Sequence, residues 1–145
     1  MEDRESKMEP KESLGLLLTD DMIFSSRITG TAKALGLKMI VVRSTKDLLV
    51  QTQECHPTCV IMDLSQLEMQ IEELIRNLME VTSCMPRLVA YGSHVDAATL
   101  RAAREAGCDL VLPRSQFVEE LPRQLSHWLT LSGSSPTDQP RLEKT

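Results

Sequence analysis

Three aspartates follow apolar segments of this chain. The segment LGLLLT leads into the adjacent pair Asp20 and Asp21, and TCVIM leads into Asp63. Carboxylates gathered at one place repel each other unless a metal cation or a guanidinium neutralises them. A hard, oxygen-seeking ion such as Mg²⁺ suits such a group, because it takes few protein carboxylates and keeps several waters. We therefore predict that Asp20, Asp21 and Asp63 form a weak Mg²⁺ site.

A basic residue follows another apolar segment, since Arg114 comes directly after DLVLP. An arginine opposite carboxylates can pair with them or bind a phosphoryl group through its planar fork. A carboxylate beside Mg²⁺ and a cation can also attack phosphorus and form an acyl phosphate. Each residue has a plainer explanation on its own, and Asp21 could simply cap a helix. Their joint placement at segment ends favours a site.

Alternating strand and helix patterns bring these residues to one edge of a sheet. Short, continuous apolar runs predict five buried parallel strands, over 14–19, 38–43, 58–62, 87–91 and 109–112. Helical periodicity follows each of them, over 21–36, from 45, over 71–79, over 96–106 and over 115–129. Five βα units predict an α/β, doubly wound, flavodoxin-like fold with right-handed crossovers. Ligands of such sheets bind at the carboxyl ends of the strands.

Two local patterns make more detailed predictions about helix starts. Ser65 and Glu68 match a capping box for the third helix, and the segment after Asp63 has no Pro or Gly, so helix should begin early there. Pro122 lies inside the last amphipathic segment, which predicts a short turn from Ser115 and a main helix that begins near Pro122.

The domain organisation follows from composition. Residues 14–132 form one predicted domain, and the polar ends, 1–13 and 133–145, are predicted to be disordered tails. The net charge of −5 without a basic patch argues against nucleic-acid binding. No apolar run reaches the roughly 18 residues of a membrane span and no signal peptide is present, so we expect a cytoplasmic protein. CHPTC lacks a second pair of ligands, which favours reduced cysteines over zinc.

The stretches LLLTDDMIF, CVIMDL and AGCDLVLPRSQF, at these intervals, resemble the receiver domains of two-component response regulators over about residues 14–131. The resemblance implies the strand order 2-1-3-4-5, Mg²⁺ dependence and phosphotransfer from a sensor histidine kinase. It implies that Asp63 is the phosphoacceptor and that Asp20 and Asp21 position Mg²⁺. It also implies that the backbone carbonyl of Ser65 joins the metal shell.

The chain departs from the family pattern at its switch positions. Arg114 stands where the family has Lys, and Ser115 stands where a proline follows it. The family's short Ser or Thr hydroxyl on the fourth strand falls on Tyr91 when counted from Pro86, and on Gly92 when counted back from Arg114. Neither residue offers that hydroxyl, which predicts an atypical receiver.

We therefore expect a stand-alone, non-enzymatic signalling domain that binds proteins: a sensor histidine kinase or another signalling protein, and weakly a second copy of itself. Either Asp63 is phosphorylated, or the chain is a phosphorylation-independent pseudo-receiver adaptor. A flavodoxin-like or Rossmann-like nucleotide binder is disfavoured, because TDDMIF puts two negative charges where a phosphate would lie. A hydrolase using His94 or His127 lacks a Ser or Cys elbow.

Overall fold

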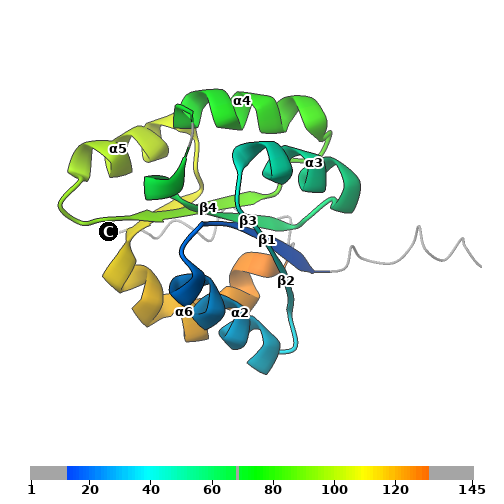
Figure 1. Cartoon of the computed structure of the whole chain (residues 1–145), viewed down its shortest axis with the longest axis vertical. Helices are drawn as coiled ribbons and strands as arrows, with labels where there is room; N and C mark the ends of the chain where they lie inside the picture. The colour runs from blue at the N-terminus through cyan, green and yellow to red at the C-terminus, as the bar shows by residue number, and fades with distance from the viewer. Residues whose placement is uncertain (1–12, 68, 131–145) are drawn as a thin grey trace, which may run out of the picture.

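A five-stranded parallel sheet forms the centre of the protein (Figure 1). The computed structural model describes residues 13–67 and 69–130, so the two predicted tails fall almost wholly outside the described residues. The strand order is β2-β1-β3-β4-β5, which confirms the predicted fold class. The strands are β1 (Leu14–Leu18), β2 (Lys38–Val42), β3 (Cys59–Asp63), β4 (Arg87–Gly92) and β5 (Leu110–Pro113).

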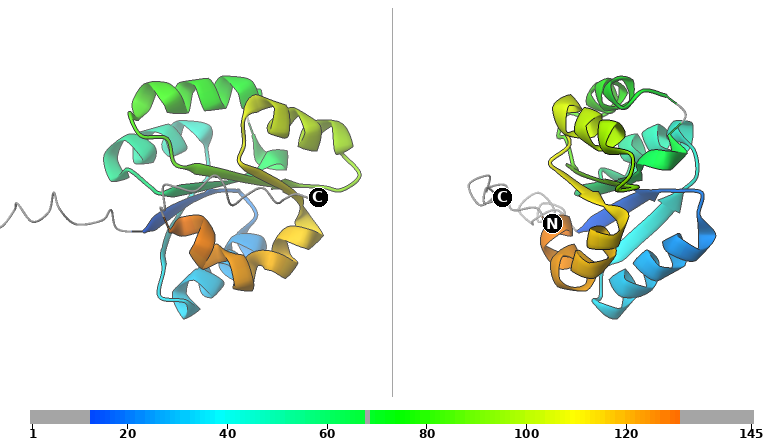
Figure 2. Two further views of the ribbon diagram at one scale, coloured as in Figure 1. Left: turned by 180° about the vertical axis from the view of Figure 1, so that it is seen from behind. Right: turned by 90° about the vertical axis from the view of Figure 1, so that its left-hand side faces the viewer.

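Helices cover both faces of the sheet, as the views of Figures 1 and 2 show. One face carries α3 (Thr45–Cys55), α4 (Ile71–Val81) and α5 (Ala97–Ala106). The other face carries α2 (Met22–Ala34) and α6 (Arg114–Leu129), and a short 3₁₀ helix, η1 (Leu64–Gln66), follows β3. None of the helices in the described part of the chain is both long enough and apolar enough to cross a membrane.

Two predictions about helix starts are wrong. The helix α6 runs unbroken through Pro122. Its buried residues continue on both sides of that proline, so packing against the sheet outweighs one lost backbone hydrogen bond. Ser65 does not cap α4 either, because α4 begins only at Ile71 and Ser65 lies in η1. Glu68, the other residue of the predicted capping box, lies outside the described residues. In η1, the Ser65 hydroxyl donates to Asp63 and accepts no N–H of α4 within the described part of the chain.

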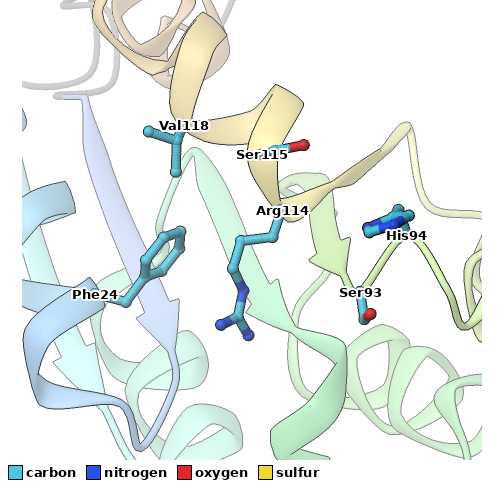
Figure 3. A pocket seen from close by; sticks show the side chains of 6 residues that line it. All are labelled: Phe24, Ser93, His94, Arg114, Ser115 and Val118. Carbon is cyan, nitrogen blue, oxygen red and sulfur yellow. The ribbon is translucent and has the colours of Figure 1, made fainter.

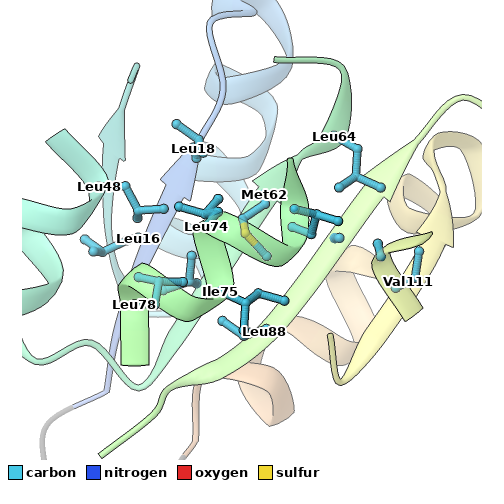
Figure 4. Packing of buried hydrophobic residues seen from close by; sticks show 14 of the residues in the cluster. Leu16, Leu18, Leu48, Met62, Leu64, Leu74, Ile75, Leu78, Leu88 and Val111 are labelled. Atoms are coloured by element: carbon cyan, nitrogen blue, oxygen red, sulfur yellow. The ribbon is translucent and has the colours of Figure 1, made fainter. Parts of the chain in front are cut away.

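The two faces of the sheet bury different side chains. Beneath α3, α4 and α5 lies an aliphatic cluster that includes Leu16, Leu48, Leu74 and Leu78 (Figure 4). Beneath α2 and α6 lies a cluster that contains every aromatic side chain of the protein: Phe24, Tyr91, Phe117 and Trp128. The aromatic cluster reaches the carboxyl edge of the sheet, because α2 and α6 both begin there.

Candidate functional site

The carboxyl ends of the strands bring Asp63 and Arg114 together, as the sequence predicts. Asp63 is the last residue of β3 and lies opposite Tyr91 of β4 in the parallel register. Arg114 is the first residue of α6, directly after β5. Its Nη2 atom lies 3.7 Å from Oδ1 of Asp63, which is an ion pair. The site is therefore built from elements that are far apart in sequence and adjacent in the sheet.

The Asp63 carboxylate is fully buried and surrounded by donors. Its exposed fraction is 0%. The Thr19 hydroxyl donates to Oδ2 over 2.8 Å. The Ser65 hydroxyl and backbone N–H donate to Oδ1 over 2.7 Å and 3.1 Å. Hydrogen bonds to an ionised acceptor are the stronger kind, and together with Arg114 they offset the cost of burying the charge. Asp63 is thus neutralised by the protein itself.

The metal group predicted from Asp20, Asp21 and Asp63 is not assembled in this structure. Asp20 is exposed, and Oδ1 of Asp21 accepts the backbone N–H of Phe24 over 2.9 Å, which caps α2. Within residues 13–67 and 69–130, no three His, Cys, Asp or Glu side chains are grouped so that they could hold a metal ion. Ser65 donates to Asp63 through its hydroxyl and backbone N–H, which are other atoms than the backbone carbonyl that the resemblance implies as a metal ligand. The three carboxylates are therefore not grouped around one point, because Asp20 is exposed, Asp21 caps α2 and Asp63 is enclosed by donors.

Arg114 is held from two sides. Its guanidinium carbon lies 5.1 Å from the centroid of the Phe24 ring and 5.7 Å from that of the Tyr91 ring, within the range of cation–π contact. A cation in the first turn of a helix is unfavourable by itself, because it meets the positive end of the helix dipole. The buried carboxylate of Asp63 and the two rings offset that cost. A planar guanidinium can stack and pair at once, which a compact ammonium cannot do.

Tyr91 brings a buried hydroxyl to the same place. Its ring packs at centroid distances of 4.9 Å from Phe24 and 4.6 Å from Phe117. Its hydroxyl is buried without a hydrogen-bond partner. Burial raises the pKa of Tyr91 well above its usual value, and the negative charge of Asp63 raises it further. Thr19 works against this shift in pKa, yet the two hydroxyl groups do not meet in hydrogen-bond geometry.

Solved structures show which fold this arrangement belongs to. The sequence matches no protein-family model and no curated protein. The structure, however, superposes on the receiver domain of a response regulator from Bermanella marisrubri with a TM-score of 0.70, at 19% identity, covering 81% of this chain and 98% of that one. The fold is that of a receiver domain. This confirms the fold that the resemblance implied.

Two further receiver structures are similar. The receiver domain of a Saccharomyces cerevisiae response regulator, crystallised with its histidine phosphotransfer protein, matches with a TM-score of 0.67 at 16% identity, covering 83% of this chain and 91% of that one. The beryllofluoride-activated NtrC4 receiver domain, a dimer, matches with a TM-score of 0.69 at 14% identity, covering 81% of this chain and 96% of that one. Both support the receiver fold.

The two residues of strand β4 on which the family's short hydroxyl could fall lie on opposite faces of the sheet. Tyr91 belongs to the aromatic cluster beneath α2 and α6. Gly92 belongs to the opposite face, where an added Cβ would lie 3.4 Å from Leu100 and 3.5 Å from Leu64. The nearest hydroxyl on this segment is that of Ser93, which is exposed. This end of β4 therefore presents a packed ring at Tyr91 and a bare backbone at Gly92.

A pocket of about 570 Å³ adjoins the ion pair. It is lined by Phe24, Ser93, His94, Arg114, Ser115 and Val118 (Figure 3). The Arg114 side chain extends between Phe24 on one side and Ser93 and His94 on the other. Sequence reasoning missed this pocket, and it also missed Thr19. The only available signal for Thr19 was a polar residue between buried leucines and the two aspartates.

Proposed function

We propose that this receiver-fold domain works as a protein-interaction module that does not depend on phosphorylation of Asp63. One observation carries the proposal: Asp63 is fully buried, its two oxygens accept three hydrogen bonds, and Arg114 pairs with it. A carboxylate must expose an oxygen to attack phosphorus. Here that oxygen would first have to give up Thr19 or Ser65, and hydrogen bonds to a buried charge are costly to break.

The same contacts argue against a two-state response. A ligand or modification shifts a conformational equilibrium only by interacting differently with its two states. Arg114 already occupies the position of the cation that would meet a phosphoryl group, and Phe24 and Tyr91 hold it there. Tyr91, fully buried in the aromatic cluster, has no room to change position freely. The domain therefore offers partners one fixed surface.

The partners fitting this role are signalling proteins, and a second copy of the chain is a weaker one. The yeast receiver noted above was crystallised with a phosphotransfer protein, and the NtrC4 receiver forms a dimer. A sensor histidine kinase could bind this domain in the same way without transferring a phosphoryl group. The module is not an enzyme in this proposal, because the carboxylate of Asp63 is buried, hydrogen-bonded at both oxygens and paired with Arg114.

A second candidate, an Mg²⁺-dependent receiver phosphorylated on Asp63, is favoured by the pocket. Arg114 borders that pocket and its side chain is 39% exposed, so movement of this one residue would open a route from solvent toward Asp63. In that case Asp21, which caps α2 through Oδ1, would offer its other oxygen to the metal.

Incubation with acetyl phosphate and Mg²⁺, followed by intact-mass measurement, separates the two functions. We expect the chain to gain no phosphoryl group under conditions that label an ordinary receiver. The variant Asp63→Asn serves as the matched control for labelling elsewhere. A Mg²⁺-dependent gain of one phosphoryl group that Asp63→Asn abolishes would overturn the proposal and establish the second candidate.

A further inference from the structure

The pocket beside Asp63 combines one cation with mixed walls. Phe24 and Val118 supply apolar surface, and Ser93, His94 and Ser115 supply polar groups around Arg114. None of the lining residues in the described part of the chain is acidic. Asp63 lies behind Arg114 and is fully buried, so its charge is balanced within the protein. An anion entering from solvent thus meets the guanidinium first.

Arg114 retains unused donor capacity. A guanidinium carries five N–H donors in a planar fork that matches a carboxylate. The Nε atom of Arg114 has no hydrogen-bond partner but is buried, so a ligand in the pocket would pair with the other nitrogens of the guanidinium. The contact with Asp63 is 3.7 Å long, whereas a close charge-assisted hydrogen bond is about 2.7–2.9 Å. The surroundings therefore hold the Arg114 side chain in place without using all of its N–H donors.

The start of α6 adds backbone donors on the same side. Ser115 is the second residue of the helix, and the N-cap residue, Pro113, makes no capping hydrogen bond. The first amides of a helix have no partner within the helix and attract negative charge. In this fold those amides lie next to the pocket that Arg114 and Ser115 line. Side-chain and backbone donors thus converge on one small region.

Exposed apolar side chains stand next to the lining residues. Ile23, which precedes Phe24, is 85% exposed, and Val95, which follows His94, is 78% exposed. Met22, the residue before Ile23, is 60% exposed. Exposed large apolar side chains are common in protein interaction sites, and an arginine beside aromatic rings is a frequent energetic centre of such sites.

We propose that this pocket binds an acidic side chain of a partner protein, an Asp or Glu flanked by apolar residues, with Arg114 as the group that recognises the carboxylate. The inference rests on the proposed function, because it names the partner chemistry of a module that works without phosphate. The carboxylate enters between Phe24 and His94 and pairs with the free side of the Arg114 fork. The apolar neighbours of the acidic residue cover Ile23 and Val95.

The bound carboxylate and Asp63 share one guanidinium, so they compete for it. Replacing Asp63 by Asn removes the internal competitor and keeps the size of the side chain. The variant Asp63→Asn should therefore bind the acidic partner several-fold more tightly, whereas Arg114→Gln should bind it at least about tenfold more weakly. A pocket that binds through apolar contact alone would respond to neither change.

The test is an NMR titration of the full chain without any phosphodonor. The first probes are acetate and acetamide, which differ only in charge and hydrogen-bonding groups. The next are two capped peptides of leucines around one central Glu or one central Gln, and inorganic phosphate. We expect acetate and the Glu peptide to shift the backbone signals of Ser93, His94 and Ser115, and we expect the Glu peptide to bind more tightly than acetate.

Variants decide whether Arg114 carries the binding. Arg123→Gln is the matched control, since Arg123 is exposed on the same helix and does not line the pocket. It should bind like the parent, while Arg114→Gln loses binding and Asp63→Asn gains it. Equal binding of the Glu and Gln peptides, or unchanged binding by Arg114→Gln, would overturn the inference. Phosphate that binds more tightly than the Glu peptide would also overturn it, by identifying a free oxyanion as the ligand.

The failure of this inference and that of the proposed function are distinguishable. Acetyl phosphate labelling reports on Asp63 alone and needs no peptide. Peptide titration reports on the pocket alone and needs no phosphodonor. Labelling of Asp63 overturns the proposed function whatever the peptides do. A pocket that binds no Glu peptide overturns the inference even when Asp63 stays unlabelled.

Discussion

The two faces of the sheet bury side chains of different chemistry. The face beneath α3, α4 and α5 is aliphatic, with leucines from β1, α3 and α4 packed together. The face beneath α2 and α6 holds all the aromatic rings of the chain. Both faces stabilise the fold through burial, yet only the aromatic one continues into the site. The position of the rings is therefore tied to the site as well as to stability.

The aromatic rings form a continuous path to Arg114. Trp128 and Phe117 stack with centroids 5.5 Å apart, and Phe117 meets Tyr91 at 4.6 Å. Tyr91 meets Phe24 at 4.9 Å, and Arg114 lies over both of these rings. Offset and tilted rings at such distances attract each other beyond the burial of their area. The rings that pack α6 against the sheet therefore also position Arg114, its first residue.

The largest expected effect comes from truncation in each core. Leu74→Ala in the aliphatic cluster and Phe117→Ala in the aromatic cluster should each lower the free energy of unfolding by about 2–5 kcal/mol, because each leaves a cavity. Denaturant titration measures the loss. NMR should then show shifted Arg114 and Tyr91 signals in Phe117→Ala alone. Equal perturbation of those signals by Leu74→Ala would show that the aromatic cluster has no special link to the site.

The next effect concerns the ion pair. Arg114→Gln should lower the free energy of unfolding by about 1–3 kcal/mol, because it leaves the buried Asp63 charge without its cation. The partial exposure of Arg114 keeps the effect below that of a fully buried pair. A double-mutant cycle with Asp63→Asn should show favourable coupling between the two residues. A coupling of zero would mean that the 3.7 Å contact contributes nothing.

The two hydroxyl groups near Asp63 should contribute differently to stability. Thr19→Val should cost about 1–2 kcal/mol, since it removes the donor to Oδ2 of Asp63. Tyr91→Phe should be neutral or stabilising by up to about 1 kcal/mol, because the hydroxyl is buried without a partner. Thermal unfolding of both variants gives the two values. If Tyr91→Phe is the more harmful of the two, the phenol makes a contact that the structure does not show.

The smallest effect is the titration of Tyr91. Its pKa is raised by burial and by Asp63, so the unfolded chain releases the phenol proton first as the pH rises. The stability that Tyr91 contributes is thus complete below the ordinary tyrosine pKa of about 10 and is lost as the pH rises above it. Because Tyr91 is the sole tyrosine, ultraviolet absorbance follows it directly. Phenolate absorbance that appears near pH 10 in the folded protein would contradict the burial of the hydroxyl.

Much of the fold could be predicted from the sequence, because the signals are local. Each strand is a short apolar run, and Asp21 caps α2 through its own carboxylate, as its position suggested. The continuous helix through Pro122 could not be predicted, since it depends on packing against the sheet across the whole of α6. Local sequence rules overestimated how strongly Pro122 would interrupt the helix, because contacts between residues distant in sequence outweigh the cost of the proline.

The candidate site, like the fold, could be predicted only in part. Asp63 and Arg114 could be placed together, because parallel strands deliver their carboxyl ends to one edge. The metal group could not be tested by sequence reasoning, since the sequence does not say whether Asp21 faces the site or caps a helix. Thr19, Tyr91 and Phe24 acquire their roles only through side-chain directions across β1, β4 and α2.

The central claim is that Arg114 holds Asp63 in one state, and NMR with beryllium fluoride and Mg²⁺ tests it most directly. This mimic of a phosphoryl group should leave the backbone signals of α5, β5 and α6 nearly unchanged, with or without Mg²⁺. Arg114→Lys, which keeps the charge but loses the stacked fork, is the matched variant in which a response could reappear. Large coordinated shifts across α5, β5 and α6 in the unaltered chain, lost in Asp63→Asn, would contradict the account.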